Sequence, residues 1–182
     1  MTNRTAATRY ARAIFDVARQ EQTNLDAIET ELAEFADLVQ QHEGLRLALL
    51  NPAVPAPRKR AAVSELVDRA GLTPVVSKTL VLLAERDRLA LLPDVIEAFR
   101  QRLMDLRNVV RAEVTTATPL SADQFHSVQR SLGLATGRTV DLSARVDPAI
   151  LGGMVARVGS TVFDGSVVNH LQRIRQRLAA SI

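Results

Sequence analysis

The side chains that could carry chemistry are few in this 182-residue sequence, and their spacing is not that of a catalytic or metal-binding site. The histidines are His42, His126 and His170, and none has a metal ligand or a nucleophile at a motif spacing. Cysteine is absent, which excludes disulfide bonds, thiolate metal sites and cysteine nucleophiles. We therefore expect the histidines on polar helix surfaces and no metal ion in the protein.

Paired carboxylates and glycine-rich segments also point away from catalysis. Glu29 with Glu31, and Glu85 with Asp87, fall on helical segments where we expect solvated faces rather than an acid–base pair. The Gly152-Gly153 pair precedes a strand instead of joining a strand to a helix, so no nucleotide-binding loop is indicated. The sequence predicts no catalytic residue, no cofactor, no small-molecule ligand and a protein that is not an enzyme.

Helical spacing of apolar residues dominates the first 106 residues. A stripe that steps by three and four residues predicts a helix capped by Thr23 or Asn24, and its members are Leu25, Ile28, Leu32, Phe35 and Val39. Prolines and glycines divide the rest into a helix before it and further helices over 45–50, 57–70, 74–88 and from Pro93 to 106. About six helices joined by short turns predict a bundle.

The first and fifth of these helices carry more apolar surface than a core-facing helix requires, which is a stripe of about 100°. The arc of the first spans roughly 200° and that of the fifth roughly 160°. The first arc holds Ala7, Tyr10, Ala11, Ala13, Ile14, Phe15, Val17 and Ala18, and the second holds Val75, Val76, Thr79, Leu80, Leu82 and Leu83. The pattern does not separate two explanations: central helices of the bundle, or walls of a groove that receives an amphipathic helix from a partner.

The apolar period changes from 3.6 to 2 after Asn108, which is typical of strands. Alternating segments at 110–116 and 140–146 enclose a helix that begins with the capping box of Ser121 and Gln124. A brief strand at 161–163 precedes a last helix that starts at Ser166. We therefore expect an α+β protein, with an all-α six-helix bundle over residues 1–106 and a small α+β domain over 107–182.

The charge of the chain leaves a second class of function open. Up to residue 105 there are 14 Lys and Arg against 15 Asp and Glu, and after it 9 against 5, so the excess basic charge lies in the C-terminal part. A nucleic-acid- or ribosome-associated binding module is therefore the alternative hypothesis. Aromatic residues make up only 3% of the chain, which provides no stacking platform and favours a protein interface. No apolar stretch reaches the length of a membrane span.

Three segments carry a family resemblance: 8–15, 88–93 and above all 140–178. The third contains an apolar–acid pair, a double glycine, a basic residue, a further glycine and an Asp-Gly-Ser turn, at Val146, Asp147, Ile150, Gly152, Gly153, Arg157, Gly159, Asp164, Gly165, Ser166 and Leu171. With this combined spacing, residues 6–180 resemble the delta subunit of F-type ATP synthase, called oligomycin-sensitivity-conferring protein in mitochondria. Ala156 departs from the pattern, where a larger aliphatic residue is more usual.

The resemblance implies a non-catalytic stator subunit of a bacterial enzyme complex. Its N-terminal domain is expected to bind the N-terminal segment of an alpha subunit on the catalytic head, and its C-terminal domain the b subunits of the peripheral stalk. This implies a peripheral membrane protein at the cytoplasmic face of the bacterial plasma membrane, with no nucleic-acid partner and no segment inserted in the membrane.

Residues of two kinds are assigned to these roles. Tyr10 and Ala13 match family positions on the first helix, whereas helical geometry assigns to the same alpha-binding surface Ile14, Val76, Leu80, Leu82 and Leu83. The resemblance implies a structural role in the C-terminal fold for Asp147, Gly152, Gly153, Gly159, Asp164, Gly165 and Ser166. The sequence thus predicts that the first and fifth helices leave apolar surface open to a foreign helix.

Overall fold

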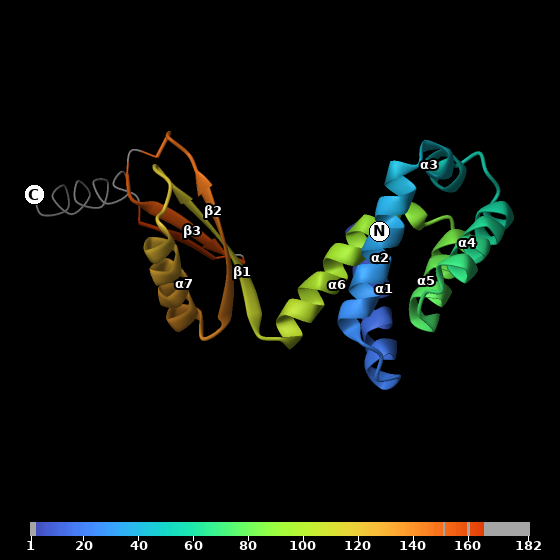
Figure 1. The fold of residues 1–182 in the computed structure, drawn as a ribbon, viewed down its shortest axis with the longest axis horizontal. Coiled ribbons are helices and arrows are strands. Elements are labelled where there is room, and N and C mark those ends of the chain that lie inside the picture. Colours follow the sequence, from blue (N-terminus) through green and yellow to red (C-terminus); the bar gives the residue numbers. More distant parts are fainter. Residues whose placement is uncertain (1–2, 151, 160, 166–182) are drawn as a thin grey trace, which may run out of the picture. The chain divides into compact units, whose positions relative to one another are not determined.

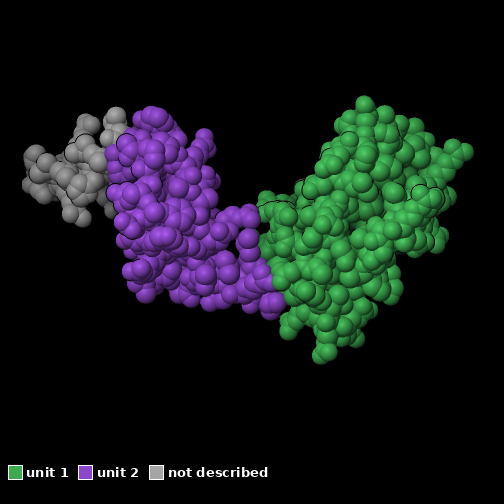
Figure 2. Space-filling view, viewed as in Figure 1, with its two compact units in different colours: residues 1–103 green, residues 104–182 purple. Residues whose placement is uncertain are grey.

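The computed structural model describes residues 3–150, 152–159 and 161–165 of the chain. The chain divides into two compact units, residues 1–103 and 104–182, coloured separately in Figure 2. The sequence predicted the boundary after residue 106. Across the described residues there are seven α-helices, one short 3₁₀ helix and a four-stranded sheet, which confirms the mixed α+β class.

The described part of the first unit is helical (Figure 1). Its elements are α1 (Asn3–Gln20), α2 (Leu25–Gln41), α3 (Glu43–Leu50), α4 (Ala56–Ala70), α5 (Pro74–Glu85), the 3₁₀ helix η1 (Leu89–Leu91) and α6 (Leu92–Leu106), whose last turn belongs to the second unit. The side chain of Asn24 caps α2 by accepting the backbone N–H of Asp26 at 3.0 Å. Pro74 opens α5, and Gly71 ends α4 in the left-handed conformation with φ of 63°.

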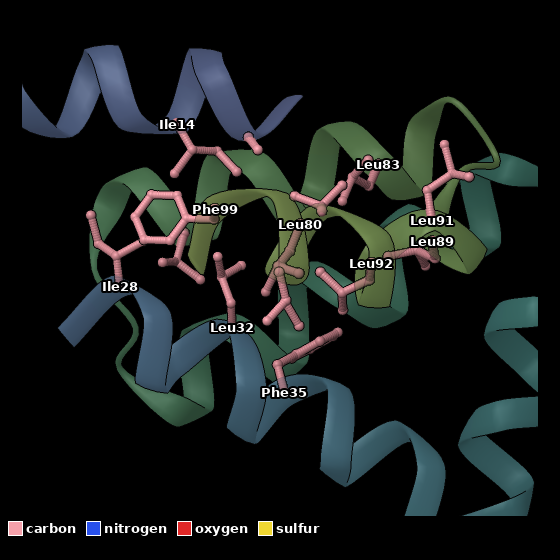
Figure 3. Close-up of a cluster of buried hydrophobic side chains, with 14 of the residues drawn as sticks. Ile14, Ile28, Leu32, Phe35, Leu80, Leu83, Leu89, Leu91, Leu92 and Phe99 are labelled. Atoms are coloured by element: carbon pink, nitrogen blue, oxygen red, sulfur yellow. The ribbon is translucent and has the colours of Figure 1, made fainter. Parts of the chain in front are cut away.

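The core of the first unit gathers around α5, which contacts α1, α2 and α4. Figure 3 shows Leu80 and Leu83 of α5 within this cluster of apolar side chains. Phe15 and Phe99 meet edge to face, with ring centroids 5.9 Å apart. Because a fully buried leucine contributes about 2 kcal/mol through the hydrophobic effect, α5 is fixed mainly by this packing.

The second unit is built on a sheet with the strand order β2-β1-β3-β4. Its elements are β1 (Val109–Thr116), α7 (Ala122–Thr136), β2 (Thr139–Val146), β3 (Met154–Val158) and β4 (Thr161–Asp164). β1 and β2 are parallel, and the other pairs are antiparallel. Parallel neighbours need a crossover connection, which α7 supplies while it packs against β2 (Figure 1). The predicted capping box of Ser121 and Gln124 is confirmed at the start of α7.

One face of β1 is buried and the other is not, as its alternating sequence requires. Ala112 and Val114 are buried in a cluster with Leu132 of α7 and Val140 of β2, whereas Arg111 and Glu113 are exposed. The sheet pairing supports this register, since Val110 lies opposite Val140 and Val114 opposite Ala144. The predicted last helix, which was to start at Ser166, lies outside the described residues.

Candidate partner-binding groove

An open groove lies between α1 and α5, with a volume of about 210 Å³. Its lining comes from one face of each helix, since the residues on both follow the i, i+3, i+4 and i+7 spacing of a helical row. From α1 and the turn after it these are Tyr10, Ala13, Ile14, Val17 and Glu21, and from α5 Val75, Lys78, Thr79 and Leu82.

The groove has a buried floor and exposed apolar walls. Ile14 and Val75 are each only 4% exposed and form the floor, whereas Val17 is 41% and Leu82 40% exposed. Isolated apolar side chains on a surface are ordinary, but here two of them flank one hollow from facing helices. Glu21 and Lys78 add one negative and one positive side chain to the lining. The groove can therefore bury a row of apolar side chains from another helix, beside one acidic and one basic side chain of its own lining.

The wide apolar arc of α1 divides between the core and this groove. Ala11 and Ala18 are fully buried in the unit's own core, and Phe15 packs there against Phe99. Ala13 and Val17 lie on the part of the arc that the core does not use, and both are exposed. The predicted surplus of apolar surface on α1 is therefore present in the structure.

The predicted groove residues of α5 need correction. Tyr10, Ala13, Ile14 and Leu82 line the groove, but the prediction that Val76, Leu80 and Leu83 are open to a partner is wrong. All three are 0% exposed, and Figure 3 shows Leu80 and Leu83 in the core cluster. The reason is that α5 packs against three helices, which use most of its apolar arc.

Some groove residues were missed. Val17, Val75 and Thr79 stood in the predicted arcs without being assigned to the surface, and Glu21 and Lys78 were not considered. Each lies three, four or seven residues from an assigned residue, as Val17 follows Ala13 by four residues and Lys78 precedes Leu82 by four. Periodicity alone could therefore have found them.

Two other hollows in the described part of the first unit differ in character from the groove. One of about 390 Å³ lies beside α4, where the ion pair of Arg60 and Glu85 crosses it at 2.9 Å. Another of about 580 Å³ surrounds the turn between α2 and α3 and includes His42 and Glu43. Both are larger than the groove, but the ion pair lies in the first, and the second is centred on a turn rather than on two facing helix rows. The α1–α5 groove remains the better candidate for an amphipathic helix.

The acidic pairs serve structural contacts, and the expectation that they only form solvated faces is wrong. Glu29 of α2 accepts a hydrogen bond from Arg100 of α6 at 2.7 Å. Glu31 accepts two from Thr73, at 2.9 Å from its backbone N–H and 2.8 Å from its hydroxyl, at the start of α5. Glu85 and Asp87 pair with cations of α4. Within the residues that the structure describes, no group of three histidine or acidic side chains could hold a metal ion.

The histidines carry no arrangement for chemistry where they are described. His42 lies exposed between α2 and α3, and His126 is exposed on α7 with its ring edge-on to Phe125. His170 falls outside the described residues. His126 thus lies on an exposed helix surface, as the sequence predicts, whereas His42 is exposed at the junction of two helices and not on a helical face.

The signature residues of the second unit lie in turns and at strand ends. Asp147 accepts the backbone N–H of Ala149 at 2.9 Å, which shapes the turn after β2. Gly152, Gly153 and Gly159 have φ of 142°, 82° and 56°, a region that other residues rarely adopt. A Cβ atom on Gly165 would lie 3.3 Å from the carbonyl oxygen of Met154. Asp164 ends β4 and is exposed, and Ser166 is outside the described residues.

Comparison with known proteins assigns the family. The family model of the ATP synthase delta (OSCP) subunit matches residues 6–178. The chain belongs to this family. ATP synthase subunit delta of Geobacter sp. (strain M21) is 35% identical over 178 residues, and that of Myxococcus xanthus is 38% identical over 180, with 98% of each chain covered in both cases.

The structural comparison agrees with this family. A chain in the cryo-EM structure of the Toxoplasma gondii mitochondrial ATP synthase hexamer matches with a TM-score of 0.61 at 26% identity, covering 95% of this chain and 97% of that one. The resemblance predicted from the sequence is thus confirmed, and the delta (OSCP) subunit is a non-catalytic part of F-type ATP synthase. The alternative of a nucleic-acid- or ribosome-associated module receives no support. None of the described helices is both long and apolar enough to cross a membrane.

Proposed function

We propose that the chain ties the catalytic head of an F-type ATP synthase to its peripheral stalk. In this proposal α1–α6 form a six-helix bundle whose α1–α5 groove binds the N-terminal segment of an alpha subunit, and residues 107–182 contact the b subunits. The observation that carries the proposal is the open apolar groove in a member of the delta (OSCP) family. The bacterial relatives support a peripheral place at the cytoplasmic face of the plasma membrane.

The groove suits an amphipathic helix of the alpha subunit on physical grounds. Such a helix inserts side chains spaced by three and four residues between two walls, and covering the exposed parts of Val17 and Leu82 contributes about 1 kcal/mol each. Ile14 and Val75 are already packed and supply a firm floor. The groove therefore offers binding energy without a large rearrangement of this chain.

The proposed role is mechanical: the chain holds two parts of the complex together, and no covalent bond is made or broken. Rotation of the central shaft exerts a torque on the catalytic head, and a head that is free to turn with the shaft cannot convert rotation into ATP synthesis. A tie between the alpha subunits and the b subunits resists that torque. The C-terminal unit contributes to this role as the stalk contact, and the signature turns around Gly152 and Gly165 give it a defined shape.

The proposal is tested by titrating the full chain with a synthetic peptide of the alpha-subunit N-terminal segment in an isothermal titration calorimeter. Leu82→Asp places a charge where the peptide would exclude water, so we expect at least about tenfold weaker binding. Leu83→Asp is unsuitable, because Leu83 is buried in the core and its replacement would unfold the helices.

The matched control is Leu47→Asp on α3, where the leucine is 56% exposed and lies outside the groove. Its affinity for the peptide should equal that of the unaltered chain. Unchanged affinity in Leu82→Asp, or an equal loss in both variants, would remove the groove from the proposed function.

A further inference from the structure

The first unit contains a buried charge that the proposed function does not yet use. Lys59 of α4 is 1% exposed, and its ammonium group contacts the carboxylate of Asp87 at 2.5 Å. Burying a charge is costly unless it is paired, and a methionine of similar length would fill the same space without that cost. The structural role of Lys59 therefore depends on its ion-pair partner, Asp87.

Asp87 occupies a backbone position that disfavours it. The turn that ends α5 is a Schellman motif, in which the N–H of Arg88 donates to the carbonyl of Leu83 at 2.8 Å and the N–H of Asp87 to that of Ala84 at 3.1 Å. Asp87 stands at the left-handed position with φ of 53°, where glycine is the usual residue. An aspartate at this position has a strained backbone, but it supplies the carboxylate that Lys59 binds. The pair thus fixes this turn against α4.

The same turn reaches the groove through the next residue. The guanidinium of Arg88 donates a hydrogen bond to the hydroxyl of Tyr10 at 3.3 Å, and Tyr10 lines the groove from α1. A series of contacts therefore runs from Lys59 on α4, through Asp87 and Arg88 in the turn, to the Tyr10 ring. It joins three elements that are distant in the sequence.

From these contacts we infer that Lys59 is a positioning residue for the α1–α5 groove: it holds the turn after α5 so that Arg88 fixes the Tyr10 ring at that end of the groove. The inference rests on the proposed function, since it concerns the binding of the alpha-subunit segment there. A ring held in place before binding loses less freedom when a helix docks. Release of the turn should therefore weaken docking without removing any contact with the partner.

The test compares full-length variants for affinity to the synthetic alpha-segment peptide. Lys59→Met removes the buried charge, and Asp87, being exposed, can be solvated, so we expect a folded protein with about fivefold weaker binding. The control is Arg60→Gln, which removes the other ion pair between α4 and the end of α5 and should leave the affinity unchanged. If Lys59→Met does not fold, Lys59→Met/Asp87→Gly gives the same test, with glycine at the left-handed position.

A double-mutant cycle separates positioning from general destabilisation. Arg88→Gln removes the link to Tyr10, so in that background Lys59→Met should cause no further loss of affinity. An equal loss in both backgrounds, or no loss in either, overturns the inference. Leu82→Asp in the same series reports on the groove itself: if it weakens binding while Lys59→Met does not, only the inference fails. If Leu82→Asp binds normally, the proposed function fails.

Discussion

Leu82 and Leu83 are neighbours on α5, yet one is exposed in the groove and the other is buried in the core. Both belong to the apolar arc that the sequence displays. A helical arc shows which side chains share a side of the helix, but not which of them the neighbouring helices cover. The extent of the apolar surface on α5 was therefore predictable, whereas its division between core and groove was not, because the packing of α1, α2 and α4 decides it.

Lys59 and Asp87 give a residue-scale prediction on stability. Asp87→Gly relieves the left-handed backbone but leaves the ammonium of Lys59 buried, so we expect a loss of about 3 kcal/mol in the free energy of unfolding. Lys59→Met/Asp87→Gly removes both charges and should recover most of that loss. Urea denaturation followed by circular dichroism measures both. Equal stability of Asp87→Gly and the unaltered chain would show that the pair is not what holds this turn.

The ends of the helices show what short-range signals can and cannot predict. The capping box of Ser121 and Gln124 was predicted because both residues lie within one turn. The end of α5 was predicted near residue 88, but it lies at Glu85, since an aspartate in the left-handed conformation is not a recognisable stop signal. The contact of Glu31 with Thr73 spans 42 residues and had no sequence signal.

Glu31 gives a prediction at the scale of one helix. Its carboxylate accepts the backbone N–H of Thr73 at the start of α5, where the helix dipole favours a negative charge. Glu31→Gln keeps the size and removes the charge, so we expect a loss of about 1 kcal/mol in the free energy of unfolding. The control is Glu34→Gln, on the exposed face of the same helix. The capping role is contradicted if the two variants lose the same stability in urea denaturation.

Across the whole chain, the change of apolar period after Asn108 predicted a helical part followed by a mixed part. The structure divides at residue 103 of the chain: the helical core is formed by residues before this point, and the sheet by residues after it. The order of the strands could not be predicted from the sequence. β1 pairs on one edge with β2, which follows it in the chain after α7, and on its other edge with β3. Such pairings depend on contacts between distant segments, which local periodicity does not encode.

The central claim is that the α1–α5 groove receives the alpha-subunit N-terminal segment, and the absence of cysteine allows a direct measurement. Leu82→Cys introduces a single thiol in the groove, and Leu47→Cys introduces one on α3 outside it. Each full-length variant is oxidised with a set of alpha-segment peptides that carry one cysteine at successive positions. We predict disulfide-linked product for Leu82→Cys at peptide positions spaced by three or four residues, and none above background for Leu47→Cys. Equal product from both variants, or product from Leu47→Cys alone, would contradict the account.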